Sequence, residues 1–168
     1  MSRTLVVMRH AKAEQEGPTD FERELSDRGH RDAADAGAWL AEQGFTPDHA
    51  LVSAASRTRQ TWAALAKGAG WDLEPELDRG LYTAEPATAV DLIGLVDDDV
   101  QALVVIGHNP TMAYLAQLLG DGEGDAELEA ALLSDFPTSA TAVFSYDGAW
   151  GDLAEGSARL VGYHVGRG

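Results

Sequence analysis

Thr4–Met8 (TLVVM) is a short apolar run that leads directly into Arg9-His10. Two further runs of the same kind follow it in the chain, Ala50–Ser53 (ALVS) and Ala102–Gly107 (ALVVIG). Each is followed by a segment whose apolar residues recur at helical spacing. This pattern is typical of buried parallel strands in an α/β sheet. We therefore predict that the three runs are strands of one sheet.

Basic side chains follow each of these predicted strands. Arg9 and His10 come directly after the first, Arg57 comes a short turn after the second, and His108 comes directly after the third. In α/β sheets the ligand crevice lies outside the carboxyl ends of the strands, so we expect the four side chains to converge on one crevice. Guanidinium groups bind phosphate oxygens in bidentate geometry. The expected ligand is therefore a phosphoryl group.

The alternation of strands and helices predicts an α/β fold, a three-layer α/β/α sandwich with a mostly parallel central sheet. Helices are expected between Ser26 and Gly44, over 57–67 and 87–96, after an N-cap at Asn109 with Pro110 in the first turn, and over 126–133. Residues 74–81 are ambiguous between strand and loop. Strands are expected over 141–146 and 158–165, and because no clear helix separates them, one should pair antiparallel at an edge. No long linker interrupts the 168 residues, so a single domain over 1–168 is predicted.

The composition excludes several classes of protein. The chain has no cysteine, which excludes disulfides, thiolate zinc sites and the cysteine-dependent phosphatases. Its 28 acidic and 12 basic residues give a net charge of −16, which disfavours nucleic acid and anionic membranes as partners. The apolar runs are too short to cross a bilayer. Arg9 interrupts the run near the N-terminus before it reaches the length of a secretory signal, so a cytoplasmic location is expected.

The four basic residues are suited to phosphoryl transfer. A nucleophilic histidine must be a neutral imidazole, and the cations Arg9 and Arg57 disfavour protonation of His10. The same guanidiniums offset the charge of the transition state. His108 stands just before a predicted helix N-terminus, where anions are favoured, and it can donate to a phosphoryl oxygen. Because phosphoryl transfer depends mainly on positioning and electrostatics, these groups can suffice without a metal or another cofactor.

Each residue taken singly also has a structural explanation. A histidine after a strand is more often structural than catalytic, and an arginine in the first turn of a helix is usually a solvated charge. The chain contains no phosphate-binding loop and no nucleophile elbow. The alternation of Asp121, Glu123 and Asp125 resembles a calcium loop but lacks its glycine and closing glutamate, so a solvated acidic loop is expected. The convergence of all four basic residues is what favours the functional interpretation.

Three motifs in the chain resemble those of the histidine phosphatase superfamily, which has the phosphoglycerate mutase-like fold. The motifs are the Arg-His pair within Met8–Ala13 (MRHAKA), the stretch Ser53–Thr61 (SAASRTRQT) and the stretch Gly107–Pro110 (GHNP). They occur in the order and spacing of the family and span most of the chain. Two positions depart from the usual pattern, because Ala11 replaces a common glycine and Ala54 replaces a proline.

The resemblance implies a role for each motif residue. His10 is implied to be the nucleophile that becomes phosphorylated. Arg9, Arg57 and His108 are implied to form the phosphate pocket, and Asn109 is expected beside them in substrate binding. No metal ligand is implied.

The short chain, the Arg-His-Ala-Lys-Ala variant and Leu25–Gly29 (LSDRG) resemble the SixA-type phosphohistidine phosphatases. That branch lacks the large helical insertions that cap the site in mutases and acid phosphatases. The resemblance thus implies an open site that suits a phosphorylated protein side chain. Asp78 and Glu85 are the candidates for a general acid, and the sequence does not decide between them.

We therefore predict a metal-independent hydrolase that acts through a phosphohistidine enzyme intermediate. Its expected substrate and partner is a protein that carries phosphohistidine. A phosphoramidate depends less on a strong general acid than an alkyl phosphate does, because its imidazole leaves readily once it is protonated. Two alternatives stay open at this stage: a phosphatase of small phosphorylated metabolites, and a phosphate-binding module without catalysis.

Overall fold

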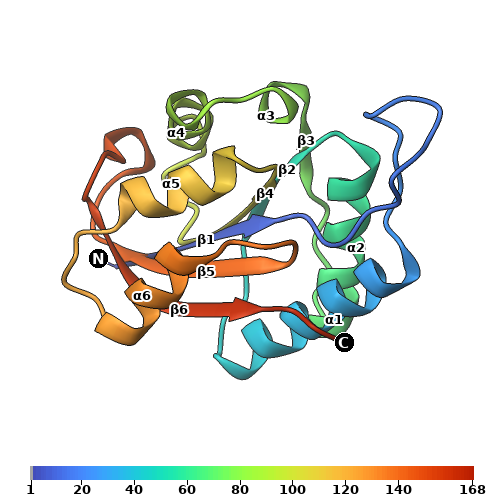
Figure 1. Cartoon of the computed structure of the whole chain (residues 1–168). Helices are drawn as coiled ribbons and strands as arrows, with labels where there is room; N and C mark the ends of the chain where they lie inside the picture. Colours follow the sequence, from blue (N-terminus) through green and yellow to red (C-terminus); the bar gives the residue numbers. More distant parts are fainter. Residues whose placement is uncertain (1) are drawn as a thin grey trace.

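The computed structural model describes residues 2–168 (Figure 1). Its elements are β1 (Arg3–Arg9), α1 (Asp27–Glu42), β2 (His49–Ser53), α2 (Ser56–Ala69), β3 (Glu76–Asp78), α3 (Arg79–Tyr82), α4 (Pro86–Gly94), β4 (Ala102–Gly107), α5 (Thr111–Leu119), α6 (Ala126–Ser134), β5 (Ala140–Tyr146), the 3-10 helix η1 (Trp150–Asp152) and β6 (Ala158–Val165). Within residues 2–168, no helix combines the length and the apolar character needed to span a membrane.

The six strands form one mixed sheet in the order β3-β2-β4-β1-β5-β6. The first four strands in this order are parallel to one another, whereas β5 is antiparallel to β1 and β6 is antiparallel to β5. The predicted α/β fold is confirmed, and so is the antiparallel pairing of the last two strands. The ambiguous segment 74–81 contains β3, a short edge strand that leads into α3.

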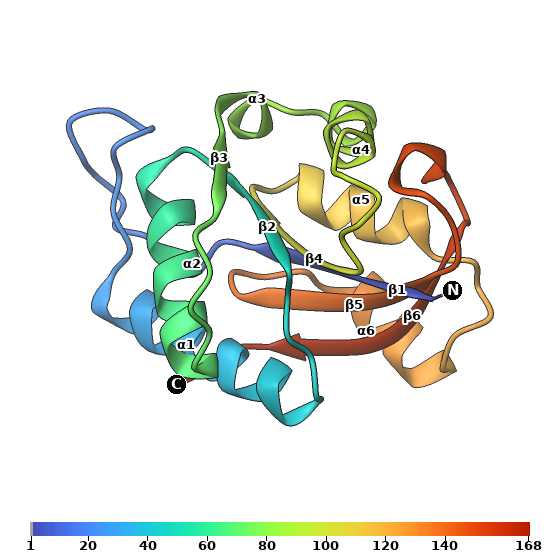
Figure 2. The ribbon, with the colours of Figure 1, turned by 180° about the vertical axis from the view of Figure 1, so that it is seen from behind.

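Helices cover both faces of this sheet, as Figures 1 and 2 show from opposite sides. The side chains of β1 alternate between the two faces: Leu5 and Val7 belong to one core cluster, and Val6 and Met8 belong to the other. The first cluster also contains buried residues of α3 to α6, and the second contains those of α1 and α2. A buried strand with apolar side chains on both faces is what a three-layer sandwich requires.

The predicted helix boundaries depend on local capping signals. Ser26 is the N-cap of α1, where its hydroxyl accepts a hydrogen bond from the Gly29 N–H at 3.0 Å. The start of α5 lies one residue later than predicted, because Pro110 and not Asn109 is its N-cap. The Asn109 amide instead donates to the Phe136 carbonyl at 2.9 Å, and its oxygen accepts from the Ala113 N–H at 3.2 Å. Asn109 thus still satisfies one N–H of the first turn of α5, and its amide group adds a tertiary contact to the segment before β5.

The two helices on the second face pack backbone against backbone. A Cβ added at Gly37 of α1 would lie 2.0 Å from the Leu65 carbonyl oxygen of α2. A Cβ added at Gly68 of α2 would likewise lie 2.2 Å from the Ala34 carbonyl oxygen of α1. The absence of a side chain at these two positions allows the close approach. This packing also fixes the axis of α2, whose first turn carries Arg57.

The substitution Gly37→Ala should therefore destabilise the fold. Alanine favours an α-helix over glycine by about 1 kcal/mol, but the two helices would have to move apart to admit its methyl group. We expect a net loss of about 2 kcal/mol or more in the free energy of unfolding, measured by urea denaturation. Gly94→Ala is the matched control, since its added Cβ would meet its nearest neighbours at 3.5 and 3.6 Å. Equal stability of both variants would contradict the close packing of α1 on α2.

Candidate active site

His10 lies where β1 ends beside β4. The two strands are paired until Arg9 stands opposite Gly107, and the His10 N–H then donates to the Gly107 carbonyl at 3.0 Å. On its other side, the His10 carbonyl accepts from the Ser139 N–H at 3.1 Å. The backbone of His10 is thus held between β4 and the segment before β5. These contacts set the direction in which its side chain leaves the sheet.

Gln60 and Thr61, at the end of the second motif, hold the loop that follows β1. The Ala11 N–H donates to the Thr61 hydroxyl at 3.0 Å, and the Leu25 N–H donates to the Gln60 side-chain oxygen at 2.7 Å. The Thr61 hydroxyl in turn donates to the Arg57 carbonyl at 2.7 Å. The two ends of the loop are therefore attached to the same helix that carries the arginine.

The imidazole of His10 has a defined tautomer. Its Nδ1 lies 2.7 Å from the Ala11 carbonyl oxygen, and because a carbonyl can only accept, Nδ1 carries the proton. The Nε2 atom therefore keeps its lone pair. The residue is only 8% exposed, and it lines a cleft at the carboxyl ends of the parallel strands. The ring is thus oriented as a nucleophile or a hydrogen-bond acceptor.

Both histidines of the site are neutral at physiological pH. Burial, together with the charges of Arg57 and Arg9, lowers the pKa of His10 to about 4, while the hydrogen bond to Ala11 opposes the shift. The pKa of His108 is lowered to about 3, chiefly by burial and to a smaller extent by His10 and Arg57. The sequence identified the arginines as the cause of this neutrality. The structure shows that burial is the larger cause.

Three buried side-chain nitrogen atoms in the site have no hydrogen-bond partner among residues 2–168. They are Arg9 Nε, Arg57 Nε and His108 Nδ1. Ser139 Oγ is the remaining buried polar side-chain atom of this kind in the described chain, and its backbone contacts His10. A buried donor without a partner costs on the order of 1–3 kcal/mol, so native proteins seldom keep several in one place. Their concentration here is typical of a site that binds an anion.

Ser53 is the hydrogen-bond partner of one ring nitrogen of His108. The Ser53 hydroxyl oxygen lies 2.7 Å from His108 Nε2 and accepts from the Ala55 N–H at 3.4 Å. Its own proton can therefore be donated to Nε2, which leaves the histidine proton on the unpartnered Nδ1. The rings of His10 and His108 lie 5.4 Å apart between centroids. His108 thus presents an N–H donor close to the lone pair of His10.

These side chains line one cleft of about 270 Å³. Its lining residues are Arg9, His10, Lys12, Ala13, Gln15, Arg23, Arg57, His108, Asn109 and Thr138. The structure therefore brings together the four basic residues predicted from the strand ends, with Asn109 beside them. The sequence did not predict Lys12, Gln15, Arg23 or Thr138, which lie on irregular segments. Of these four residues, only Lys12 could have been expected in the cleft, because it lies two residues after His10 in the sequence.

The two candidate general acids lie outside this lining. The Asp78 carboxylate is the N-cap of α3 and accepts from the Gly80 N–H at 2.7 Å and the Leu81 N–H at 3.3 Å. Glu85 is the N-cap residue of α4 and makes no side-chain capping bond. Among residues 2–168, no carboxylic acid lines the cleft. The carboxylate nearest to the basic cluster is Asp20, which pairs with Arg57 and was not predicted.

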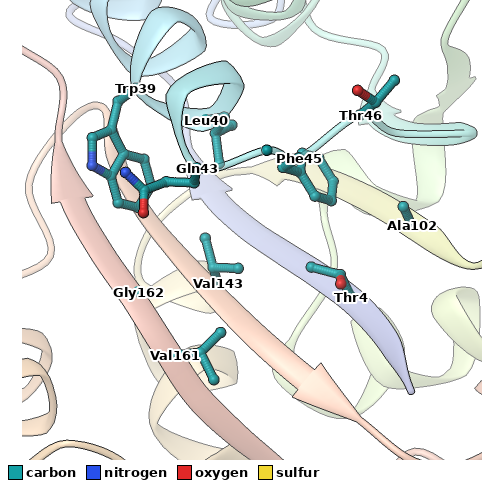
Figure 3. A pocket seen from close by; sticks show the side chains of 11 residues that line it. Thr4, Trp39, Leu40, Gln43, Phe45, Thr46, Ala102, Val143, Val161 and Gly162 are labelled. Carbon is teal, nitrogen blue, oxygen red and sulfur yellow. The ribbon is translucent and has the colours of Figure 1, made fainter. Parts of the chain in front are cut away.

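A second hollow lies at the opposite ends of the parallel strands and carries no such chemistry (Figure 3). It has a volume of about 370 Å³ and lies between the C-terminal part of α1 and the sheet, with Trp39, Phe45 and Val143 in its wall. None of its lining residues is titratable. Elsewhere too, the described chain has no group of three or more histidine or carboxylate side chains placed to hold a metal ion.

Comparison with known proteins identifies the family to which this site corresponds. The model of the histidine phosphatase superfamily (branch 1) matches residues 5–83. An uncharacterised protein of Mycobacterium tuberculosis is 41% identical over 162 residues, which cover 95% of this chain and 100% of that protein.

Two solved structures described as the phosphohistidine phosphatase SixA are similar over almost the whole chain. The one from Nakamurella multipartitia has 31% sequence identity and a TM-score of 0.87, and the match covers 99% of this chain and 97% of the other. The one from Agrobacterium tumefaciens has 31% identity and a TM-score of 0.80, with 97% of each chain covered. The fold and the motif residues thus agree on one family.

Removing the Arg57 charge should raise the pKa of His10. The Arg57→Met variant loses a cation that disfavours the imidazolium, but burial still disfavours it, so the pKa should rise from about 4 while staying below 6.5. A histidine titration followed by nitrogen-15 NMR measures this pKa and also reports the Nδ1–H tautomer.

Arg59→Met is the control for this titration, because Arg59 lies on the same helix but is exposed. It should leave the pKa of His10 unchanged. A wild-type pKa near 6.5, or equal pKa values in the wild type and Arg57→Met, would contradict the electrostatic description of the site.

Proposed function

Because this chain belongs to the histidine phosphatase superfamily, in its SixA-type branch, we propose that it hydrolyses phosphoryl groups through a covalent phosphohistidine formed on His10. The observation that carries the proposal is the set of unpartnered buried nitrogen atoms on Arg9, Arg57 and His108, which line one cleft with His10. A phosphoryl group has enough oxygens to accept from all three while its phosphorus faces the Nε2 lone pair.

In the first step, the Nε2 lone pair of His10 attacks phosphorus. The bond from phosphorus to the leaving group breaks, and its electron pair goes to the leaving group. The Nδ1 proton stays on the ring and keeps its hydrogen bond to the Ala11 carbonyl, so the ring keeps its orientation while positive charge develops on it. Arg9 and Arg57 stabilise the negative charge of the phosphoryl oxygens.

In the second step, water attacks the phosphorus of the phosphohistidine. The nitrogen–phosphorus bond breaks, its electron pair returns to Nε2, and inorganic phosphate leaves with a proton passing from water to the product or to solvent. A pKa of about 4 keeps the released His10 neutral for the next cycle.

The favoured substrate is phosphohistidine on a protein. No carboxylic acid lines the cleft among residues 2–168, and Asp20 beside it is held ionised, with its pKa lowered to about 2 chiefly by the hydrogen bond from Tyr82. An alkyl phosphate needs a proton donor for its leaving oxygen, whereas the imidazole of a phosphoramidate can leave after protonation from solvent. Two proteins with similar structures are described as phosphohistidine phosphatases, which is the same substrate class.

We further propose that the reaction needs no metal ion. The two guanidiniums supply the positive charge that a metal would supply to the phosphoryl oxygens, and they would repel a divalent cation from the same position. The net charge of −16 also disfavours nucleic acid and anionic membranes as partners. The cytoplasmic location expected from the sequence stays a prediction.

Turnover of an aryl phosphate in EDTA tests the mechanism. The wild type should hydrolyse the ester in EDTA, and His10→Ala should lower kcat at least about a thousandfold because the nucleophile is lost. Acid-quench of the wild type should trap a phosphoryl group on His10, detected by mass spectrometry. His49→Ala is the control, because His49 pairs with Glu76 and is the first residue of β2, at the end of that strand away from the cleft. Equal turnover by wild type and His10→Ala would remove His10 from the mechanism.

The same assay distinguishes the substrates. A phosphohistidine protein should be hydrolysed with a higher kcat/KM than an alkyl phosphate. The reverse order would favour a phosphatase of small metabolites. Phosphate binding without a trapped intermediate and without turnover would identify a binding module.

A further inference from the structure

Asp20, on the loop between β1 and α1, holds one edge of the Arg57 guanidinium. The Arg57 Nη1 atom donates to the Asp20 main-chain carbonyl at 2.7 Å, and Nη2 donates to the Asp20 carboxylate at 3.2 Å. Arg57 is 5% exposed, so its guanidinium is largely shielded from water where these contacts form. The Nε atom of the same guanidinium has no partner among residues 2–168.

The two edges of the guanidinium therefore have different surroundings. Nη1 and Nη2 both donate to Asp20, whereas Nε–H has no partner and can donate to a ligand. Guanidinium groups bind oxyanions in a bidentate manner through such paired N–H groups. A phosphoryl group can thus bind Arg57 at the Nε side without displacing Asp20.

Asp20 is itself held from two further directions. The Tyr82 hydroxyl of α3 donates to the carboxylate oxygen that Arg57 also contacts. Arg23 Nε donates to the other carboxylate oxygen at 3.0 Å. Asp20 therefore joins three segments around the cleft: its own loop, the first turn of α2 and α3.

The neighbouring residue secures the same junction. The Phe21 carbonyl accepts from the Ser56 N–H at 3.0 Å, its ring contacts Tyr82 edge to face at 4.9 Å, and the Arg79 guanidinium lies 4.6 Å from its centroid. The Tyr82 ring also contacts the His108 ring edge to face at 5.4 Å. Asp20 thus lies on a segment that contacts both the start of α2 and α3.

We propose that Asp20 is a positioning residue for catalysis, which orients the Arg57 guanidinium toward the phosphoryl group and links it through Tyr82 to His108. The proposal rests on the phosphatase function proposed above. It assigns Asp20 no contact with the substrate and no transfer of a proton. The opposite interpretation is that the carboxylate imitates phosphate and competes with it for Arg57. The unpartnered Nε–H of Arg57 and the hydrogen bonds that Asp20 accepts from Arg23 and Tyr82 favour the positioning role.

Substitutions of Asp20 separate these two interpretations. Asp20→Ala removes the carboxylate acceptor and leaves only the Asp20 main-chain carbonyl to orient Arg57. We expect kcat to fall by about 10- to 100-fold, as for the loss of one charge-assisted hydrogen bond. Asp20→Asn keeps one acceptor oxygen and should restore part of this loss. KM should change less than kcat, because Arg9 and His108 still bind the ground-state phosphoryl group.

Tyr82→Phe provides an independent variant. If Tyr82 acts through Asp20, the double variant with Asp20→Ala should be no slower than Asp20→Ala alone, whereas independent roles would give multiplied losses. Asp72→Asn is the charge-matched control, since Asp72 is exposed and follows the far end of α2. It should leave kcat and KM unchanged.

Binding of inorganic phosphate, measured by calorimetry, keeps the proposal testable even if the wild type hydrolyses nothing. If Asp20 positions Arg57, Asp20→Ala should bind phosphate more weakly than the wild type, by a smaller factor than its loss in kcat, and Asp20→Asn should lie between them. Tighter binding or faster turnover in both variants would show that Asp20 competes with phosphate, and unchanged values would show that it has no role. Absent wild-type turnover would instead count against the phosphatase function alone.

The unfolding temperature of the Asp20 variants should differ little from that of the wild type, because the Asp20 side chain is 57% exposed.

Discussion

The parallel pairing of β1 with β4 is the constraint on which the site depends. It places Arg9 opposite Gly107 and continues one step further, through the hydrogen bond from the His10 N–H to the Gly107 carbonyl. The residues that follow the two strands, His10 and His108, therefore emerge side by side. A shift of the register by one residue would turn every side chain of β1 to the opposite face and would separate the two rings. The side chains of β1 alternate between the two core clusters, and this alternation fixes the register that brings the two histidines together.

This geometry leaves polar groups unsatisfied, which is costly for the fold. Three nitrogen atoms without partners, on Arg9, Arg57 and His108, represent several kcal/mol of lost hydrogen bonding at about 1–3 kcal/mol each. The surrounding packing keeps these groups in place: α2 lies against α1 with glycines at the contact, and the loop after β1 is attached to Thr61 and Gln60. A rigid frame that keeps donors unpaired is what electrostatic catalysis requires, because the donors need no rearrangement when an anion binds.

Most of the fold and the centre of the site could be predicted from the sequence, because both depend on local patterns. Short apolar runs mark the strands, and the basic residues directly after them mark the carboxyl edge of the sheet. The remaining parts depend on tertiary contacts that no local pattern encodes. Asp20 and Arg23 lie in an irregular loop whose path is set by α2 and α3. Asp78 carries the carboxylate expected of a general acid, but its place before Arg79-Gly80 makes it a helix cap, and that signal could have been recognised.

The distribution of charge limits how such a site can meet its substrate. Four of the 12 lysines and arginines line the cleft, while the chain as a whole carries a charge of −16. At physiological ionic strength, charges beyond about 8 Å are largely screened, so the basic cluster attracts an anion mainly at short range, and the net acidic charge of the chain adds no attraction beyond it. Selection then depends on contacts that form once a phosphoryl group has reached the cleft. This distribution of charge is consistent with the substrate proposed above, a phosphoryl group presented on a protein whose own surface supplies docking energy.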